Sequence, residues 1–181
     1  MIGSTIADIA VSFDGQEEIQ PNQGFKDSAY AARIIATGWQ VGEPWCAAAA
    51  ISDWTDAYQP FVELAAKAKK LYSLNSQQMG RNFHADPVWP TSTNVPVVGA
   101  MAIYGDGDST ITGHTGIVIE VMTDGVTYRT EEGNTIPDGN PGDQREGYIV
   151  AQHTHKVGQP HSVTGLNLIR FIHPMEPPAV A

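Results

Sequence analysis

The chain has 181 residues, of which 41% are hydrophobic and 17% charged, and its formal net charge is -10 at pH 7. This composition is typical of one globular domain and excludes a disordered chain. The excess of acidic side chains argues against binding nucleic acid or anionic lipid through the overall electrostatic field. A single cysteine excludes an internal disulfide.

Helical periodicity dominates the first half of the chain. Ser4 is the expected cap of the first helix, and the second helix is expected to bury Tyr30, Ile34 and Ile35 and to end at Gly38. Apolar residues at helical spacing predict helices over residues 4–13, 26–37, from Cys46 to about 58, from after Pro60 to 71, and over 76–83.

Cys46 stands where a loop containing Pro44 gives way to an alanine-rich run. Proline disfavours helix at the residue before it, so a helix is predicted to begin close to Cys46. In the first turn of a helix, outward N–H groups and the dipole favour a nucleophilic thiolate. The alternative is a small buried hydrophobic residue, and position alone supports the two interpretations about equally.

After Pro96 the periodicity changes to that of strands. Asp124-Gly125 between two apolar runs is typical of a hairpin, whereas residues 85–96 are expected to be irregular. Helices followed by antiparallel strands indicate an α+β fold, with one domain over residues 1–174 and a flexible tail over 175–181. The predicted strands cover residues 98–104, 115–122, 126–131, 148–153 and 166–172.

His114 opens one of these strands, between Gly113 and Thr115-Gly116. Such a position holds an imidazole rigidly beside a loop, and the flanking glycines leave room for a ligand. A cysteine nucleophile needs a base of this kind. Without Cys46, a solvated histidine at a strand end would be the better interpretation.

The strand after the hairpin runs into Glu131-Glu132-Gly133-Asn134. Alternation places Glu132 and Asn134 on one side of the strand, next to the His114 strand. Either side chain could accept the Nδ1 proton of His114 and aim the other ring nitrogen at Cys46. The alternative is an ordinary polar strand end.

At this point the sequence resembles the CHAP branch of the NlpC/P60-like, papain-related hydrolases. The similarity extends from Gln16 to Ile172, and two further segments resemble phage-type members. The segments that carry it, in order, are Pro44-Trp45-Cys46-Ala47, Gly99-Ala100-Met101-Ala102-Ile103-Tyr104, Gly113-His114-Thr115-Gly116-Ile117-Val118, and the phage-type Glu132-Gly133-Asn134-Thr135 and Arg145-Glu146-Gly147.

The resemblance implies a papain-like fold, with N-terminal helices packed on an antiparallel sheet of about five strands. It implies amidase or endopeptidase activity on peptidoglycan peptides, without a cofactor. Carried over by motif, Cys46 is the nucleophile, His114 the base, and Glu132 and Asn134 the orienting or oxyanion-side groups. Trp45 is expected to form a wall beside the nucleophile or to line a substrate groove, and Gly113 to face the substrate.

The sequence also departs from the family. Ala100 stands where many members have an acidic residue, and residues 35–43 lack the clustered carboxylates of a calcium site. The Asp106-Gly107-Asp108 segment is expected to be a solvated turn. We expect no metal, and expect the remaining strand and loop histidines to be superficial or structural: His153, His155, His161 and His173.

The N-terminus has no signal-peptide pattern, and no run is long enough to span a membrane. We therefore expect a monomer made in the bacterial cytoplasm that reaches the cell wall or periplasm through a holin, a phage tail or a secretion system. We expect no wall-binding module after the domain. Three functions are open: a phage or prophage endolysin, a secreted antibacterial amidase effector with an immunity partner, and a non-catalytic wall-binding module.

Overall fold

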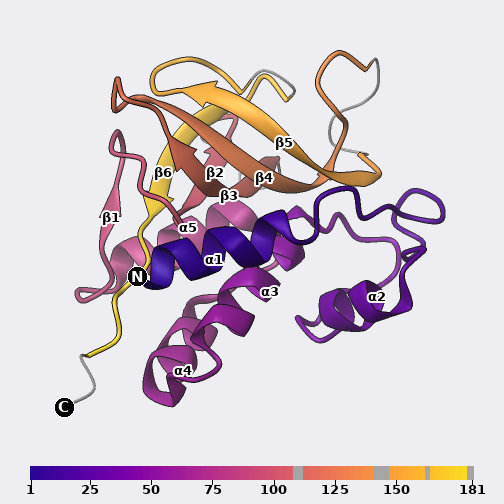
Figure 1. Ribbon diagram of the computed structural model, residues 1–181, viewed down its shortest axis with the longest axis horizontal. Coiled ribbons are helices and arrows are strands. Elements are labelled where there is room, and N and C mark those ends of the chain that lie inside the picture. Colours follow the sequence, from indigo (N-terminus) through magenta and orange to yellow (C-terminus); the bar gives the residue numbers. More distant parts are fainter. Residues whose placement is uncertain (108–111, 141–146, 162–163, 179–181) are drawn as a thin grey trace.

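The computed structural model describes residues 1–107, 112–140, 147–161 and 164–178. These residues form five helices and a six-stranded antiparallel sheet (Figure 1), so the predicted α+β fold is confirmed. The helices are α1 (Ile2–Val11), α2 (Ser28–Ile35), α3 (Cys46–Tyr58), α4 (Val62–Leu71) and α5 (Ser76–Ala85). The strands are β1 (Thr91–Ser92), β2 (Met101–Gly105), β3 (Gly113–Val121), β4 (Thr127–Thr135), β5 (Ile149–Lys156) and β6 (Asn167–Ile172).

The sheet has the strand order β1-β6-β2-β3-β4-β5. Strands β2, β3, β4 and β5 therefore follow one another as neighbours, and the chain then crosses back so that β6 pairs with β2 and β1. The connection between β5 and β6 contains His161. Figure 1 shows the sheet above the helices, with α2 set apart on one side.

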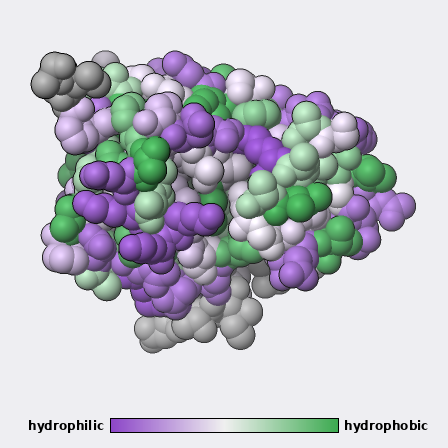
Figure 2. Space-filling model, turned by 90° about the horizontal axis from the view of Figure 1, so that it is seen from below, coloured by the Kyte–Doolittle hydropathy of each residue, from purple (hydrophilic) through white to green (hydrophobic). Residues whose placement is uncertain are grey.

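The main core lies between the helices and one face of the sheet. Apolar residues of α1, α3, α4 and α5 pack there with Ile103 of β2 and Ile117 of β3. A second cluster on the opposite face joins Tyr104, Val118 and Tyr128. The outer surface of the helices is mixed, with hydrophobic residues interspersed among hydrophilic ones (Figure 2).

Helix α3 is the central helix and begins at Cys46, as predicted. Its small alanines allow close packing, and most of its residues are buried. The indole of Trp54 donates a hydrogen bond of 2.9 Å to the carbonyl of Gly99, which joins the helix to the segment before β2. Because α3 is fixed in this way along its length, the position of its first residue is also fixed.

Several sequence predictions need correction. Helix α1 begins at Ile2 and not at Ser4, because the carboxylate of Glu176 accepts the Ile2 N–H with both oxygens, at 3.1 and 3.0 Å. Met175, the first residue of the expected tail over 175–181, exchanges hydrogen bonds with the Tyr58 hydroxyl. The predicted inward residue Ile35 is 55% exposed.

The strands differ from prediction mainly in length. Strand β4 extends to Thr135 and thus includes both Glu132 and Asn134, and the short strand β1 lies in the segment expected to be irregular. Asp108, Arg145 and Glu146 lie outside the described residues. Within the described part of the chain, no helix combines the length and the apolar character that crossing a bilayer requires.

Candidate active site

Cys46 and His114 meet at one end of the sheet. Cys46 is the first residue of α3, and His114 is the second residue of β3; both are largely buried. The His114 ring hydrogen bonds with the Cys46 side chain. The first N–H groups of α3 have no acceptor within the helix, so this end of α3 also offers donors for a developing negative charge.

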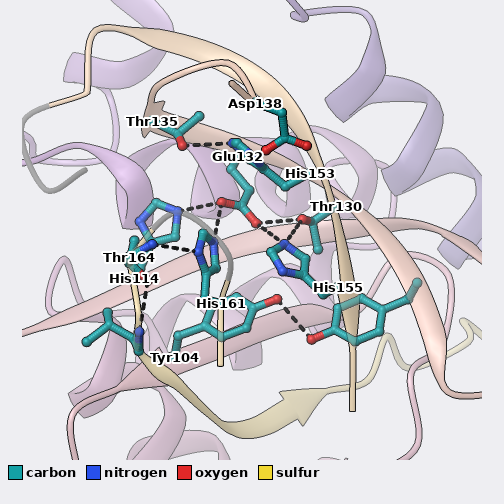
Figure 3. A network of polar contacts seen from close by, with 12 residues as sticks. Tyr104, His114, Thr130, Glu132, Thr135, Asp138, His153, His155, His161 and Thr164 are labelled. Carbon is teal, nitrogen blue, oxygen red and sulfur yellow. Dashed lines mark hydrogen bonds and ion pairs between the residues drawn. The ribbon is translucent and has the colours of Figure 1, made fainter. Parts of the chain in front are cut away.

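Glu132 of β4 is the acidic partner of His114. Its Oε2 lies 2.8 Å from Nε2 of His114 (Figure 3). The sequence prediction had the carboxylate at Nδ1, and this is wrong. Nε2 is the ring atom farther from the backbone and reaches the neighbouring strand, which leaves Nδ1 for Cys46.

The site carries an internal ion pair. Burial by itself lowers the pKa of His114, but the Glu132 carboxylate, together with Cys46, raises it to about 10. Burial raises the pKa of Glu132, yet His161 and His114 lower it well below its usual value. At neutral pH His114 is therefore a cation held by an ionised carboxylate.

Glu132 passes very close to β3. A Cβ atom added at Gly116 would lie 2.5 Å from Cγ of Glu132, a distance that real Cβ atoms do not show. Only glycine at position 116 leaves room for the Glu132 side chain to reach His114. Gly116, one of the two glycines near His114, therefore makes room for the Glu132 carboxylate.

Two more histidines contact Glu132, and the sequence analysis missed them. Nε2 of His161 lies 2.9 Å from Oε2, and Nε2 of His155 lies 2.8 Å from Oε1 (Figure 3). Both rings are buried, so of the two expectations for these histidines, surface or structural, the surface one is wrong for them. The two-residue spacing of His153 and His155 is a signal that could have placed both on one face of a strand, whereas His161 comes from the connection to β6 and has no such signal.

His153 belongs to a neighbouring arrangement. Its Nδ1 lies 2.7 Å from the Asp138 carboxylate, and its Nε2 lies 2.9 Å from the Thr135 hydroxyl. Although a hydroxyl, an imidazole and a carboxylate are aligned, Thr135 is fully buried. This set of contacts therefore fixes the end of β4, whereas His173 lies apart and contacts Ser92 and Val95.

The other predicted site residues lie around the Cys46–His114–Glu132 chain. Asn134 is buried and has a left-handed backbone with φ 56° at an irregularity of β4. Gly113 and Cys46 both line a cavity of about 310 Å³. Trp45 is fully buried against Phe25 and donates its indole N–H to Glu18, so it forms a wall and does not line this cavity.

Three members of this cluster also lie close enough together to hold a metal ion. Ligand atoms of His114, Glu132 and His161 lie within 4.8 Å of one another. However, Nδ1 of His161 accepts the backbone N–H of Thr164 at 3.0 Å, so the ring proton is on Nε2. A metal would need that nitrogen without its proton. Among the described residues this cluster therefore fits a hydrogen-bond network better than a metal.

Comparison with known proteins gives one match. The family model described as CHAP domain matches residues 30–134, more than half of the 181-residue chain. The matched segment includes Cys46, His114, Glu132 and Asn134. No curated protein and no solved structure matches the chain.

Proposed function

Because the chain belongs to the CHAP domain family, whose domain implies amidase or peptidase activity on peptidoglycan, we propose that it cleaves an amide bond of peptidoglycan peptides with Cys46 as nucleophile. The observation that carries this proposal is the continuous contact from Cys46 through His114 to Glu132. A thiol, an imidazole and an orienting carboxylate in this order are the groups that thiol hydrolysis requires.

The geometry supports a two-step reaction. The Cys46 thiolate attacks the amide carbonyl carbon, and backbone N–H groups at the start of α3, including that of Cys46, stabilise the oxyanion. His114 gives its proton to the leaving amine as the C–N bond breaks, which yields a thioester. His114 then takes a proton from water, the hydroxide attacks the thioester, and the C–S bond breaks, which releases the carboxylic acid and restores the Cys46 thiolate beside protonated His114.

Two cavities near the start of α3 offer room for a peptide substrate. Leu74 lines the cavity beside Cys46 and also a second cavity of about 440 Å³ between α3 and α4. The two cavities therefore share one lining residue. Lys69 lines the second cavity, and its charge suits the carboxylates of peptidoglycan stem peptides.

The test is mass spectrometry of purified peptidoglycan after digestion by wild type and by Cys46→Ala. We expect new fragments with wild type only, and their masses identify the bond as sugar–peptide or peptide–peptide. Asn134→Ala, assayed in parallel, tests the proposed oxyanion-side role of Asn134. Fragments from both wild type and Cys46→Ala would overturn the mechanism. If folded wild type leaves several peptidoglycan chemotypes intact, the non-catalytic module becomes the better proposal.

We further propose an endolysin-like role in which another component delivers the enzyme to the wall. The phage-type motif at Glu132-Gly133-Asn134-Thr135 supports this role over that of a secreted effector. Expression in a Gram-negative host, with and without an added export signal, tests the need for delivery: lysis is expected only after export or co-expression of a holin. Protection by the product of an adjacent gene would instead favour the effector.

A further inference from the structure

We propose that His161 and His155 are positioning residues that donate their Nε2 protons to the two oxygens of Glu132 and so keep it the anionic partner of His114. The proposal rests on the proposed function, because it assigns a role within the same site. The family match ends at residue 134 and includes neither histidine.

The Thr164 N–H determines the proton position in His161. A backbone N–H can only donate, so Nδ1 of His161 must accept, at 3.0 Å, and carries no proton. The single ring proton is then on Nε2, 2.9 Å from Oε2 of Glu132. His161 is therefore a fixed neutral donor, and burial lowers its pKa, which keeps it neutral.

His155 supplies the second donor, on the other carboxylate oxygen. Its Nε2 lies 2.8 Å from Oε1 of Glu132 and 2.9 Å from the hydroxyl of Thr130. That hydroxyl itself donates to Oε1 at 2.5 Å. Within the described residues, Nδ1 of His155 is buried without a hydrogen-bond partner, which places the ring proton on Nε2.

Glu132 thus accepts four donors, two on each oxygen: His114 and His161 on Oε2, and Thr130 and His155 on Oε1. A carboxylate with no exposed surface would otherwise become protonated, because burial disfavours its charge. His114 and His161 share one oxygen, but His114 is charged and His161 is neutral. The neutral donors stabilise the anion without competing with His114 as cations.

The first experiment needs no variant. Nitrogen-15 NMR of histidine-labelled wild type reports the proton on each ring nitrogen. At pH 7 we expect His161 and His155 to carry a proton on Nε2 only, and His114 to carry protons on both nitrogens. A proton on Nδ1 of His161 or of His155, or a charged His161, would overturn the proposal.

The second experiment compares His161→Gln with His161→Phe. The Gln side chain can still donate an N–H to Glu132, whereas Phe fills the space without a donor. The readout is the rate of Cys46 alkylation by iodoacetamide against pH, which reports the thiolate. With Phe, Glu132 becomes protonated at a higher pH, so the loss of reactivity in acid should move up by about one pH unit.

His161→Gln should retain a profile close to wild type, and His173→Phe, outside the network, serves as the matched control. Equal profiles for Phe and wild type, or equal losses for Gln and Phe at every pH, would overturn the proposal. Circular dichroism checks that each variant is folded. If His161→Phe does not fold, the NMR experiment on wild type decides whether the proposal holds. Neither readout uses peptidoglycan, so a failure of the proposed function leaves this test intact.

Discussion

Glu131 and Glu132 are adjacent buried carboxyl groups in β4, yet at neutral pH Glu131 is protonated and Glu132 is ionised. Glu132 faces histidines and a threonine that donate hydrogen bonds, and its pKa lies well below the usual value. Glu131 points to the helix side of the sheet. Burial and the nearby Asp14 carboxylate raise its pKa to about 8.

The comparison shows that burial alone does not decide whether a carboxyl group is charged. Both side chains are at least nine-tenths buried, with 4% exposure for Glu131 and none for Glu132. The donors around Glu132 offset the loss of solvation, whereas Glu131 has acidic neighbours, Asp14 and Asp53. One strand thus places an ionised group on the side of His114 and a neutral acid in the core.

Replacing Glu131 or Glu132 by Gln should give the largest difference in activity between two variants. Glu132→Gln removes the anion beside His114, and we expect kcat/KM on peptidoglycan to fall roughly hundredfold or more. Glu131→Gln replaces an already neutral group and should leave kcat/KM within about threefold at pH 7. Steady-state assays of both variants, checked for folding by circular dichroism, test this. Equal losses at the two positions would refute the assignment of charges.

The pH dependence of stability tests the neutral state assigned to Glu131. Between its ordinary value of 4.5 and its folded value of about 8, the unfolded chain is ionised at this position while the folded protein keeps the proton. The folded state then binds more protons, so its stability falls as pH rises through this window. Glu131→Gln removes this pH-dependent loss of unfolding free energy, which we expect to be on the order of 3 kcal/mol in wild type. Urea unfolding at pH 5 and pH 8 measures it; parallel declines for variant and wild type would contradict it.

Arg33 should matter for stability and little for activity. Its guanidinium lies 2.8 Å from the buried Asp53 and 2.7 Å from Asp56. Burial raises the pKa of Asp53 to about 7 even though Arg33 lowers it. Arg33→Met should cost about 2 kcal/mol, more at pH 8 than at pH 5, because Asp53 then lacks its cation. Thermal unfolding measures the cost, with the exposed Arg81→Met as control; an equal cost at both pH values would show that Asp53 is not responsible.

The smallest effect is expected at a carboxylate on the surface. Glu176 is exposed and caps α1 through the Ile2 N–H. Because water competes for both groups, Glu176→Gln should destabilise by roughly 0.5 to 1 kcal/mol and lower Tm by about 1 to 3 °C. Differential scanning calorimetry checks this. A loss as large as that of Arg33→Met would show that the end of the chain contributes more than a cap.

The sequence predicted features that depend on nearby residues. Pro44 and the alanine-rich run located the start of α3, and the Asp124-Gly125 hairpin predicted that β3 and β4 are neighbours. The pairing of His114 with one of two side chains of β4 followed from that hairpin. Strand alternation did not decide whether Glu132 or Asn134 is the partner of His114, because it does not predict the left-handed backbone at Asn134.

The features that were missed depend on contacts distant in sequence. His161 reaches Glu132 across 29 positions, from a connection whose course is set by the return of the chain to β6. The start of α1 depends on Glu176, 174 positions away. Likewise, the ring nitrogen that faces Glu132 depends on how two strands are placed, which residue types do not reveal.

The contact between Gly116 and Glu132 has a consequence for how activity can be lost. Adding one methyl group, as in Gly116→Ala, would push the carboxylate away from His114 while every polar side chain of the site stays in the sequence. A related chain could therefore keep its cysteine, histidine and glutamate and still be inert. The reactive groups alone would not reveal such a loss, whereas the residue at position 116 would.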